Sequence, residues 1–277
     1  MRLRSGGSRG FPDRVRRCWM NRVCLGLLRF DPDAEWPVLL TSIRDEFLAR
    51  PAEPPDAWWP QDHPGLVGGK DGRAGGTWLA VDPVLRQVAA VYTPGKPTAP
   101  DSGLRSRGEI PLLALRAAGS GDPQLIVPSQ YEPFSLLVAG ADLVTWSVWK
   151  DGEWSVTQIE PGMHALNNWG LDVVDASARQ ARWRPQFGAA VPASVSMGGS
   201  SQDSWASWID LLAHEPEPEK EDSLFLLRTV NDEGYGTKSA SLIAIGPDAL
   251  RYDSTERPWE PETWSRVDLG APAQAAG

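Results

Sequence analysis

The residues best suited to chemistry are Cys24, which opens an apolar segment, and the charged pair Arg44 and Asp45, which ends the next apolar segment. An N-terminal cysteine supplies two catalytic functions, because its thiol attacks a carbonyl carbon while its own α-amine accepts the thiol proton. The α-amine has a pKa of about 7.7–8.0, so it acts as a base near neutral pH. The alternative is a small apolar residue packed in a core strand.

Arg44 and Asp45 are expected to lie close to Cys24. The apolar runs Val23 to Phe30 and Pro37 to Ile43 are separated by Asp31-Pro32-Asp33, and such a break predicts a hairpin. In this hairpin Arg44 would lower the thiol pKa by its fixed charge, and Asp45 would hold the α-amine by a charge-assisted hydrogen bond. The alternative is an exposed charged turn.

The nucleophile hypothesis requires a free amine on Cys24, and the preceding residues decide whether one exists. Residues 1–22 are rich in Arg, have one acidic residue, Asp13, and lack the apolar core of a secretory signal. They are interpreted as a disordered basic tail, a cryptic targeting segment or a mis-called start of translation. We favour the mis-called start, because the composition indicates GC-rich codons and a GTG start codon would be written as Val23. Removal of the initiating Met would then expose Cys24.

The elements that position these residues are mostly strands. Short apolar runs alternate with loops dense in Pro, Gly and Asp, and uniform composition favours one α+β domain over residues 23–268, with a flexible tail over 269–277. Helical spacing marks residues 109–118, 176–183 and 201–213. Strands are expected at 77–81, 87–93, 135–139, 143–149, 153–159, 163–167, 224–230, 239–245 and 249–252, with loops at 50–76, 94–108 and 214–222.

Composition narrows the classes of function. The 277 residues are 41% hydrophobic and 23% charged, as in an ordinary globular protein of the cytoplasm. The formal net charge of −9 argues against non-specific nucleic-acid binding, and no apolar run approaches the roughly 20 residues of a membrane span. Cys18, Cys24 and the histidines lack zinc-site spacing, so we expect no metal and no resident cofactor.

Motifs along the chain resemble the NRDE family, also called the transport and Golgi organisation protein 2 family. The naming motif Asn-Arg-Asp-Glu appears here with Ile43 in place of Asn. Glycines 68, 69, 75 and 76 belong to the most specific segment and are expected to form a tight turn rather than a phosphate loop. The matching segments, in family order, are Ile43-Arg44-Asp45-Glu46, Gly68-Gly69-Lys70-Asp71, Ala74-Gly75-Gly76-Thr77-Trp78-Leu79, Ser106-Arg107-Gly108-Glu109, Tyr131 to Leu137, Pro161-Gly162 with His164, Asn168 with Gly170-Leu171-Asp172, and Tyr235-Gly236-Thr237-Lys238-Ser239.

The resemblance implies a fold similar to N-terminal nucleophile hydrolases, which is a four-layer αββα sandwich of two mostly antiparallel sheets. It supports catalytic roles for Cys24, Arg44 and Asp45. Asn168 matches the position of an amide that stabilises the oxyanion, and a turn residue before Gly170 is the alternative. Lys238 stands where Arg is more usual, and it supplies a positive charge without the forked geometry of a guanidinium.

Two classes of function follow from the resemblance. The first is a hydrolase of linear amides, acting on carbon–nitrogen bonds other than peptide bonds. The second is a non-enzymatic haem or lipid carrier, because the family is linked to haem handling and lipid homeostasis. For the carrier, His63 or His164 would ligate haem iron. Six tryptophans would line its apolar pocket, with plain core packing as the alternative: Trp58, Trp59, Trp78, Trp146, Trp149 and Trp169.

Overall fold

The hairpin that follows Cys24 is present in the computed structural model, which describes residues 24–94, 102–192, 195–218, 220–230 and 232–270. Strand β1 (Leu25–Phe30) pairs antiparallel with β2 (Val38–Phe47), so the prediction from the two apolar runs is confirmed. The expected extension over residues 1–22 lies outside the described residues, as does most of the expected tail. The other strands of the same sheet are arranged on both sides of this hairpin.

The hairpin forms the centre of an eight-stranded antiparallel sheet, which we call the first sheet. Its order is β11-β10-β1-β2-β13-β14-β15, with β12 paired to β13. Strand β2 continues four residues beyond the predicted end at Ile43, because β13 pairs with it as far as Phe47. Arg44 and Asp45 therefore lie inside a strand and not at its end. The other strands are β10 (Gly162–Asn167), β11 (Gly170–Leu171), β12 (Leu227–Val230), β13 (Glu233–Ile245), β14 (Leu250–Thr255) and β15 (Ser265–Arg266).

The second sheet has seven strands that follow one another in chain order. Two of them lie in the segment 50–76, so the prediction of a loop there was wrong. The prolines Pro54 and Pro55 are tolerated because β3 is an edge strand, where a missing N–H costs little. Gly68 permits close strand contact, since a Cβ there would lie 2.4 Å from the Leu79 carbonyl oxygen. The strands are β3 (Ala52–Asp56), β4 (Val67–Asp71), β5 (Leu79–Asp82), β6 (Gln87–Tyr92), β7 (Phe134–Ala139), β8 (Val144–Lys150) and β9 (Glu153–Gln158).

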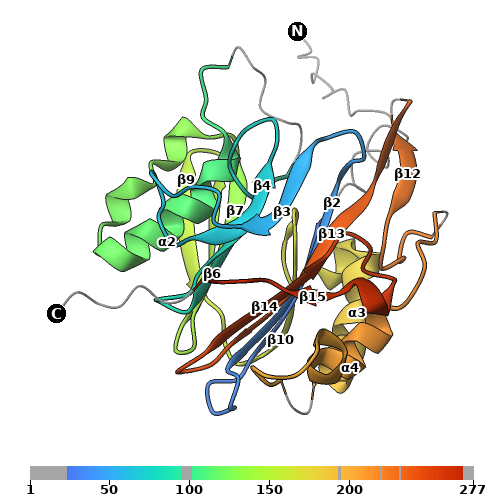
Figure 1. Ribbon diagram of the computed structural model, residues 1–277. Helices are drawn as coiled ribbons and strands as arrows, with labels where there is room; N and C mark the ends of the chain where they lie inside the picture. Colours follow the sequence, from blue (N-terminus) through green and yellow to red (C-terminus); the bar gives the residue numbers. More distant parts are fainter. Residues whose placement is uncertain (1–23, 95–101, 193–194, 219, 231, 271–277) are drawn as a thin grey trace, which may run out of the picture.

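Helices cover the outer face of each sheet (Figure 1). Helix α4 forms as predicted, because Trp205, Trp208 and Leu212 recur at helical spacing and bury one face. Helix α3 extends past Pro185 to Ala189, since Trp183 and Phe187 both pack in the core beneath it. The helices are α2 (Ile110–Ser120), α3 (Ala178–Ala189) and α4 (Ser201–Leu212), with short helices η1 (Arg107–Glu109), η2 (Pro123–Leu125), η3 (Pro128–Gln130), η4 (Val174–Ala176) and η5 (Pro261–Thr263).

Three hydrophobic cores separate the layers. The central core lies between the two sheets and includes Leu28, Tyr92 and Trp146. A second core lies between the first sheet and helices α3 and α4, and a third lies between the second sheet and α2. The order of layers is therefore helix, sheet, sheet, helix, which confirms the expected α+β sandwich (Figure 1). Within the described residues, no helix has the length and apolar character to cross a membrane.

Candidate functional site

Cys24 lies at the open end of β1, between the neighbouring strands β2 and β10. Leu25 pairs with Ile43 on one side and with Asn167 on the other. Continuing the β1–β2 register by one residue places Cys24 opposite Arg44, and opposed residues of an antiparallel sheet project from the same face. Asn168 begins the turn that follows the end of β10, one residue beyond the partner of Leu25. The hairpin therefore brings Cys24 beside Arg44, close to the turn that contains Asn168.

Arg44 and Asp45 project to opposite faces of β2, because side chains alternate along a strand. The Arg44 guanidinium enters the space between the sheets, where it stacks 4.1 Å from the ring centroid of Trp78. The Asp45 carboxylate enters the core beneath α3. There it lies 2.5 Å from the Arg179 guanidinium and accepts a hydrogen bond of 2.5 Å from the Thr237 hydroxyl. Both carboxylate oxygens of Asp45 are thus engaged. The expected role of Asp45 in holding the α-amine of Cys24 stays a prediction.

The Cys24 thiol is held in a setting that favours its neutral form. It donates a long hydrogen bond of 3.7 Å to the Asp45 carbonyl oxygen. Burial and the nearby Asp45 charge raise the pKa of Cys24 to about 12, and Arg44 lowers it by less than these raise it. The expected lowering of the thiol pKa by Arg44 is therefore smaller than the rise caused by burial and Asp45. With residues before Cys24 in place, the thiol needs a base to react at neutral pH.

Alkylation of Cys24 in the full 277-residue chain is expected to be slow at neutral pH and to accelerate without a plateau as the pH rises towards about 12. An ordinary thiol, with a pKa of about 8.5, would reach its plateau far earlier, because only the thiolate reacts. Iodoacetamide labelling followed by intact mass measures this in a Cys18→Ala variant, with the urea-unfolded chain as control. A plateau below about pH 9 in the folded chain would contradict the buried setting.

Asn168 reaches across to the second sheet. Its side-chain amide donates a hydrogen bond of 3.0 Å to the Thr93 carbonyl oxygen at the end of β6. The turn into β11 is instead stabilised by Asn167, whose side-chain oxygen accepts hydrogen bonds from the backbone N–H groups of Trp169 and Gly170. Asn168 itself lies in this turn, as its alternative interpretation expected, and Asn167 supplies the hydrogen bonds that close the turn. The role of Asn168 in holding an oxyanion stays a prediction.

Lys238 lies at an irregularity in β13, where the pairing with β2 shifts register between Thr237 and Ser239. Its ammonium donates hydrogen bonds to the carbonyl oxygens of Leu48 and Arg50, 3.0 Å and 2.5 Å away. Burial and the neighbouring charge of Arg44 lower the pKa of Lys238. Lys238 therefore stabilises the connection between β2 and β3 and adds positive charge beside Arg44.

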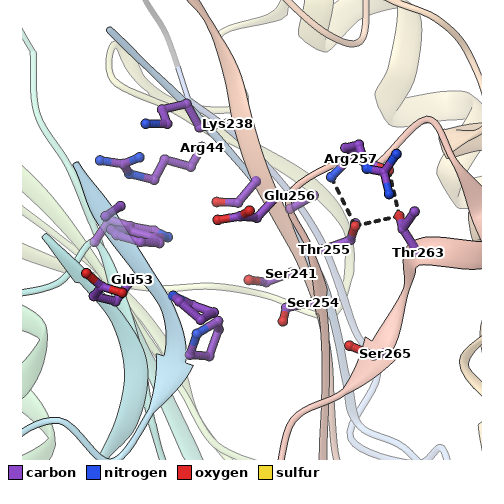
Figure 2. Close-up of a pocket in the computed structure, with 16 residues that line it drawn as sticks. Arg44, Glu53, Lys238, Ser241, Ser254, Thr255, Glu256, Arg257, Thr263 and Ser265 are labelled. Carbon is purple, nitrogen blue, oxygen red and sulfur yellow. Dashed lines mark hydrogen bonds between the residues drawn. The ribbon is translucent and has the colours of Figure 1, made fainter. Parts of the chain in front are cut away.

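A pocket of about 360 Å³ opens beside Arg44 and Lys238, between β3 on one side and β13 and β14 on the other (Figure 2). Its wall is rich in hydroxyl groups. Of the six tryptophans expected to line an apolar pocket, Trp78 is the single one among the described residues that line this pocket. The lining consists of Arg44, Ala52, Glu53, Pro54, Pro55, Trp78, Lys238, Ser239, Ala240, Ser241, Ser254, Thr255, Glu256, Arg257, Thr263 and Ser265.

Metal-ligating groups do not gather in the described parts of the chain, where no three His, Cys, Asp or Glu side chains are placed to share an ion. His164 has both ring nitrogens in hydrogen bonds, one to Asp172 and one to the Glu160 carbonyl oxygen. Asp172 also pairs with Arg184, so this cluster links β10 to α3. These contacts give His164 a structural role.

Arg179 is the functional-site residue that the sequence did not reveal. It lies on α3, 134 residues from Asp45, and also donates to the Leu224 carbonyl oxygen. The segment 176–183 shows only a weak helical pattern, and an Arg in such a segment is most often solvated. The one hint in the sequence was Asp45, because a carboxylate placed in a buried strand needs a cationic partner.

Known proteins relate to this chain as follows. A model of the family described as Transport and Golgi organisation 2 matches residues 23–261. No match exists among curated proteins. Among solved structures, a Caenorhabditis elegans N-acylethanolamine-hydrolyzing acid amidase ortholog has a TM-score of 0.41 and 9% identity, over 87% of this chain and 95% of that chain, a likeness too weak to support an argument about function. The ordered motifs and the family match together establish that the chain belongs to the Transport and Golgi organisation 2 family.

Proposed function

We propose that the protein is an N-terminal nucleophile hydrolase of linear amides, with Cys24 as the nucleophile. The observation that carries the proposal is the placement of Cys24 opposite Arg44 and close to the turn that contains Asn168, with Arg44 also lining the pocket. These residues combine a nucleophile with an amide donor and a fixed positive charge. Acyl transfer through a cysteine needs these groups.

The reaction would proceed through an acyl thioester. The α-amine of Cys24 takes the thiol proton, and the sulfur attacks the carbonyl carbon to form a tetrahedral oxyanion. The C–N bond then breaks, and the α-ammonium gives its proton to the departing amine. Water hydrolyses the thioester with the α-amine as base, which restores the thiol and releases a carboxylic acid. An oriented donor such as the Asn168 amide contributes about 3 kcal/mol to oxyanion stabilisation.

A free amine on Cys24 is essential to this proposal. The raised thiol pKa means that Cys24 has little thiolate at neutral pH unless a base accepts its proton. The α-amine is the base that a terminal cysteine carries itself. The family match begins at residue 23, immediately before Cys24, so Cys24 lies within the part of the chain that the family shares.

The haem or lipid carrier stays a prediction that the pocket does not favour. Serine and threonine hydroxyls, two carboxylates and three cationic side chains are among the groups that line the pocket, whereas haem and acyl chains bind mainly to apolar walls. The Soret band of added haem tests the carrier directly. A saturable shift at stoichiometric protein would support it over the hydrolase.

Two forms of the chain test the hydrolase, one beginning at Cys24 and one retaining residues 1–23. A panel of p-nitroanilides with acidic, neutral and long-chain acyl groups reports amine release, and intact mass reports an acyl adduct on Cys24. We expect turnover and adduct only in the form that begins at Cys24, because only there is the amine free. Equal activity in both forms would contradict the role of the α-amine. If the form that begins at Cys24 is folded but hydrolyses no member of the panel, the hydrolase proposal is contradicted.

A further inference from the structure

The Arg44 side chain is nearly buried and yet makes no hydrogen bond with any described residue. Its side chain is 5% exposed, and its Nη1 atom is buried with no partner. The nearest carboxylate oxygen, on Asp71, is 3.8 Å away, beyond hydrogen-bond distance. That carboxylate is engaged by Arg50 at 2.6 Å and 3.1 Å. Unsatisfied buried donors are costly, so an arginine kept in this state indicates a site for an acceptor.

The position of Arg44 suits a bidentate acceptor. Its guanidinium stacks on the Trp78 ring at 4.1 Å, which holds its plane fixed. Stacking leaves the N–H donors at the edge of the guanidinium, where a carboxylate accepts two parallel hydrogen bonds. Figure 2 shows Arg44 and Lys238 together at one end of the pocket. Lys238 adds a second positive charge there, while its hydrogen bonds to Leu48 and Arg50 keep it in place.

The rest of the pocket limits what accompanies the anion. Hydroxyl groups line the wall, among them those of Ser254 and Ser265, and they suit a short polar molecule rather than a long acyl chain. Glu53 and Glu256 also line the pocket and repel an anion placed beside them. The third cation of the lining, Arg257, is paired with Glu260, which leaves Arg44 and Lys238 as the cations available to an acid group. The two glutamates favour ligand N–H or O–H groups beside them.

We propose that this pocket binds the carboxylate of a short acidic acyl group, with Arg44 as its anchor. The substrates would then be amides whose short acyl group carries a free carboxylate in addition to the amide that Cys24 attacks. The identity of the reaction rests on the proposed hydrolase function. Binding of the carboxylate does not, because it requires neither Cys24 nor a free amine.

Calorimetric titration of the full chain carrying Cys24→Ala tests the binding directly. The probes are glutarate, its neutral diamide glutaramide, and hexanoate, which has one carboxylate and an apolar tail. We expect glutarate to bind at least about tenfold more tightly than glutaramide, as charge-assisted bidentate hydrogen bonds imply. We also expect it to bind more tightly than hexanoate, because the polar wall of the pocket does not suit an apolar tail. Arg44→Gln should lower glutarate affinity by about tenfold or more. Lys150→Gln removes an equal charge from an exposed site and should leave the affinity unchanged.

Specific results would overturn the proposal. Equal affinity for glutarate and glutaramide would show that the acid group is not recognised, and tighter binding of hexanoate would indicate an apolar acyl site. Unchanged glutarate affinity in Arg44→Gln would remove Arg44 as the anchor. If Arg44→Gln does not fold, Arg44→Lys decides, since it keeps the charge without the forked donors and should still weaken glutarate several-fold. If the chain that begins at Cys24 shows no amide turnover while glutarate binding is observed, the hydrolase proposal fails and the carboxylate site stands.

Discussion

Cys24→Ala, made in the chain that begins at this residue, is expected to lower amide turnover by a factor on the order of 10⁴ to 10⁶. Alanine retains the terminal amine, but it has no sulfur to attack the carbonyl carbon. The substitution leaves Asn168 and Arg44 unchanged, so the residual rate reports what oxyanion stabilisation and binding achieve without a nucleophile. Release of p-nitroaniline under saturating substrate measures the change.

Cys24→Ser is the matched control for this experiment. It keeps a nucleophile of similar size with a much less acidic proton, so it should fall between the wild type and Cys24→Ala and should still form a detectable ester adduct. Circular dichroism and the midpoint of thermal unfolding verify that each variant is folded. If Cys24→Ala retains more than about one hundredth of the wild-type rate, Cys24 is not the nucleophile.

Arg179→Met is expected to lower the free energy of unfolding by about 3–5 kcal/mol. The side chains of Arg179 and Asp45 are 7% and 0% exposed, so methionine leaves a buried carboxylate without its counter-ion. Burial already raises the pKa of Asp45, and the Arg179 charge is the main interaction that opposes this rise. Urea unfolding followed by tryptophan fluorescence measures the loss of stability.

The pH dependence and a double variant separate charge from packing. The ionised form of a buried acid with a raised pKa destabilises the folded state, so the stability deficit of Arg179→Met should be smaller at about pH 4 than at about pH 7. Combining it with Asp45→Asn removes the unpaired charge and should recover part of the loss. Lys220→Met breaks an exposed pair with Glu217 and should cost about 0–1 kcal/mol. A comparable loss in both single variants would contradict the role of burial.

The sequence by itself determined the elements whose signals are local. The apolar runs before and after Asp31-Pro32-Asp33 predicted the β1–β2 hairpin, and helical spacing from 201 to 213 predicted α4. Motif order predicted the family, which the match over residues 23–261 confirms. These signals succeed because a hairpin or a helix is specified by residues close together in the chain.

Tertiary pairing alone decided where the strands of the segment 50–76 lie and how far β2 extends. Pro54 and Gly68 indicate a loop when only local preference is considered. In the structure Pro54 lies in edge strand β3 and Gly68 lies against the β5 backbone, so neighbouring strands override that preference. Pairing with β13 likewise carries β2 past Ile43 to Phe47.

The chemistry around Cys24 shows the same division. Sequence spacing placed Cys24 near Arg44 and Asp45, and strand alternation requires that this adjacent pair project to opposite faces. Only the packing of two sheets and a helix decided that Arg44 meets Trp78 and the pocket, while Asp45 meets Arg179. Such partners are distant in the chain, so no local pattern specifies them. The terminal amine that would turn Cys24 into a nucleophile depends on the covalent start of the chain, and its environment depends on the fold.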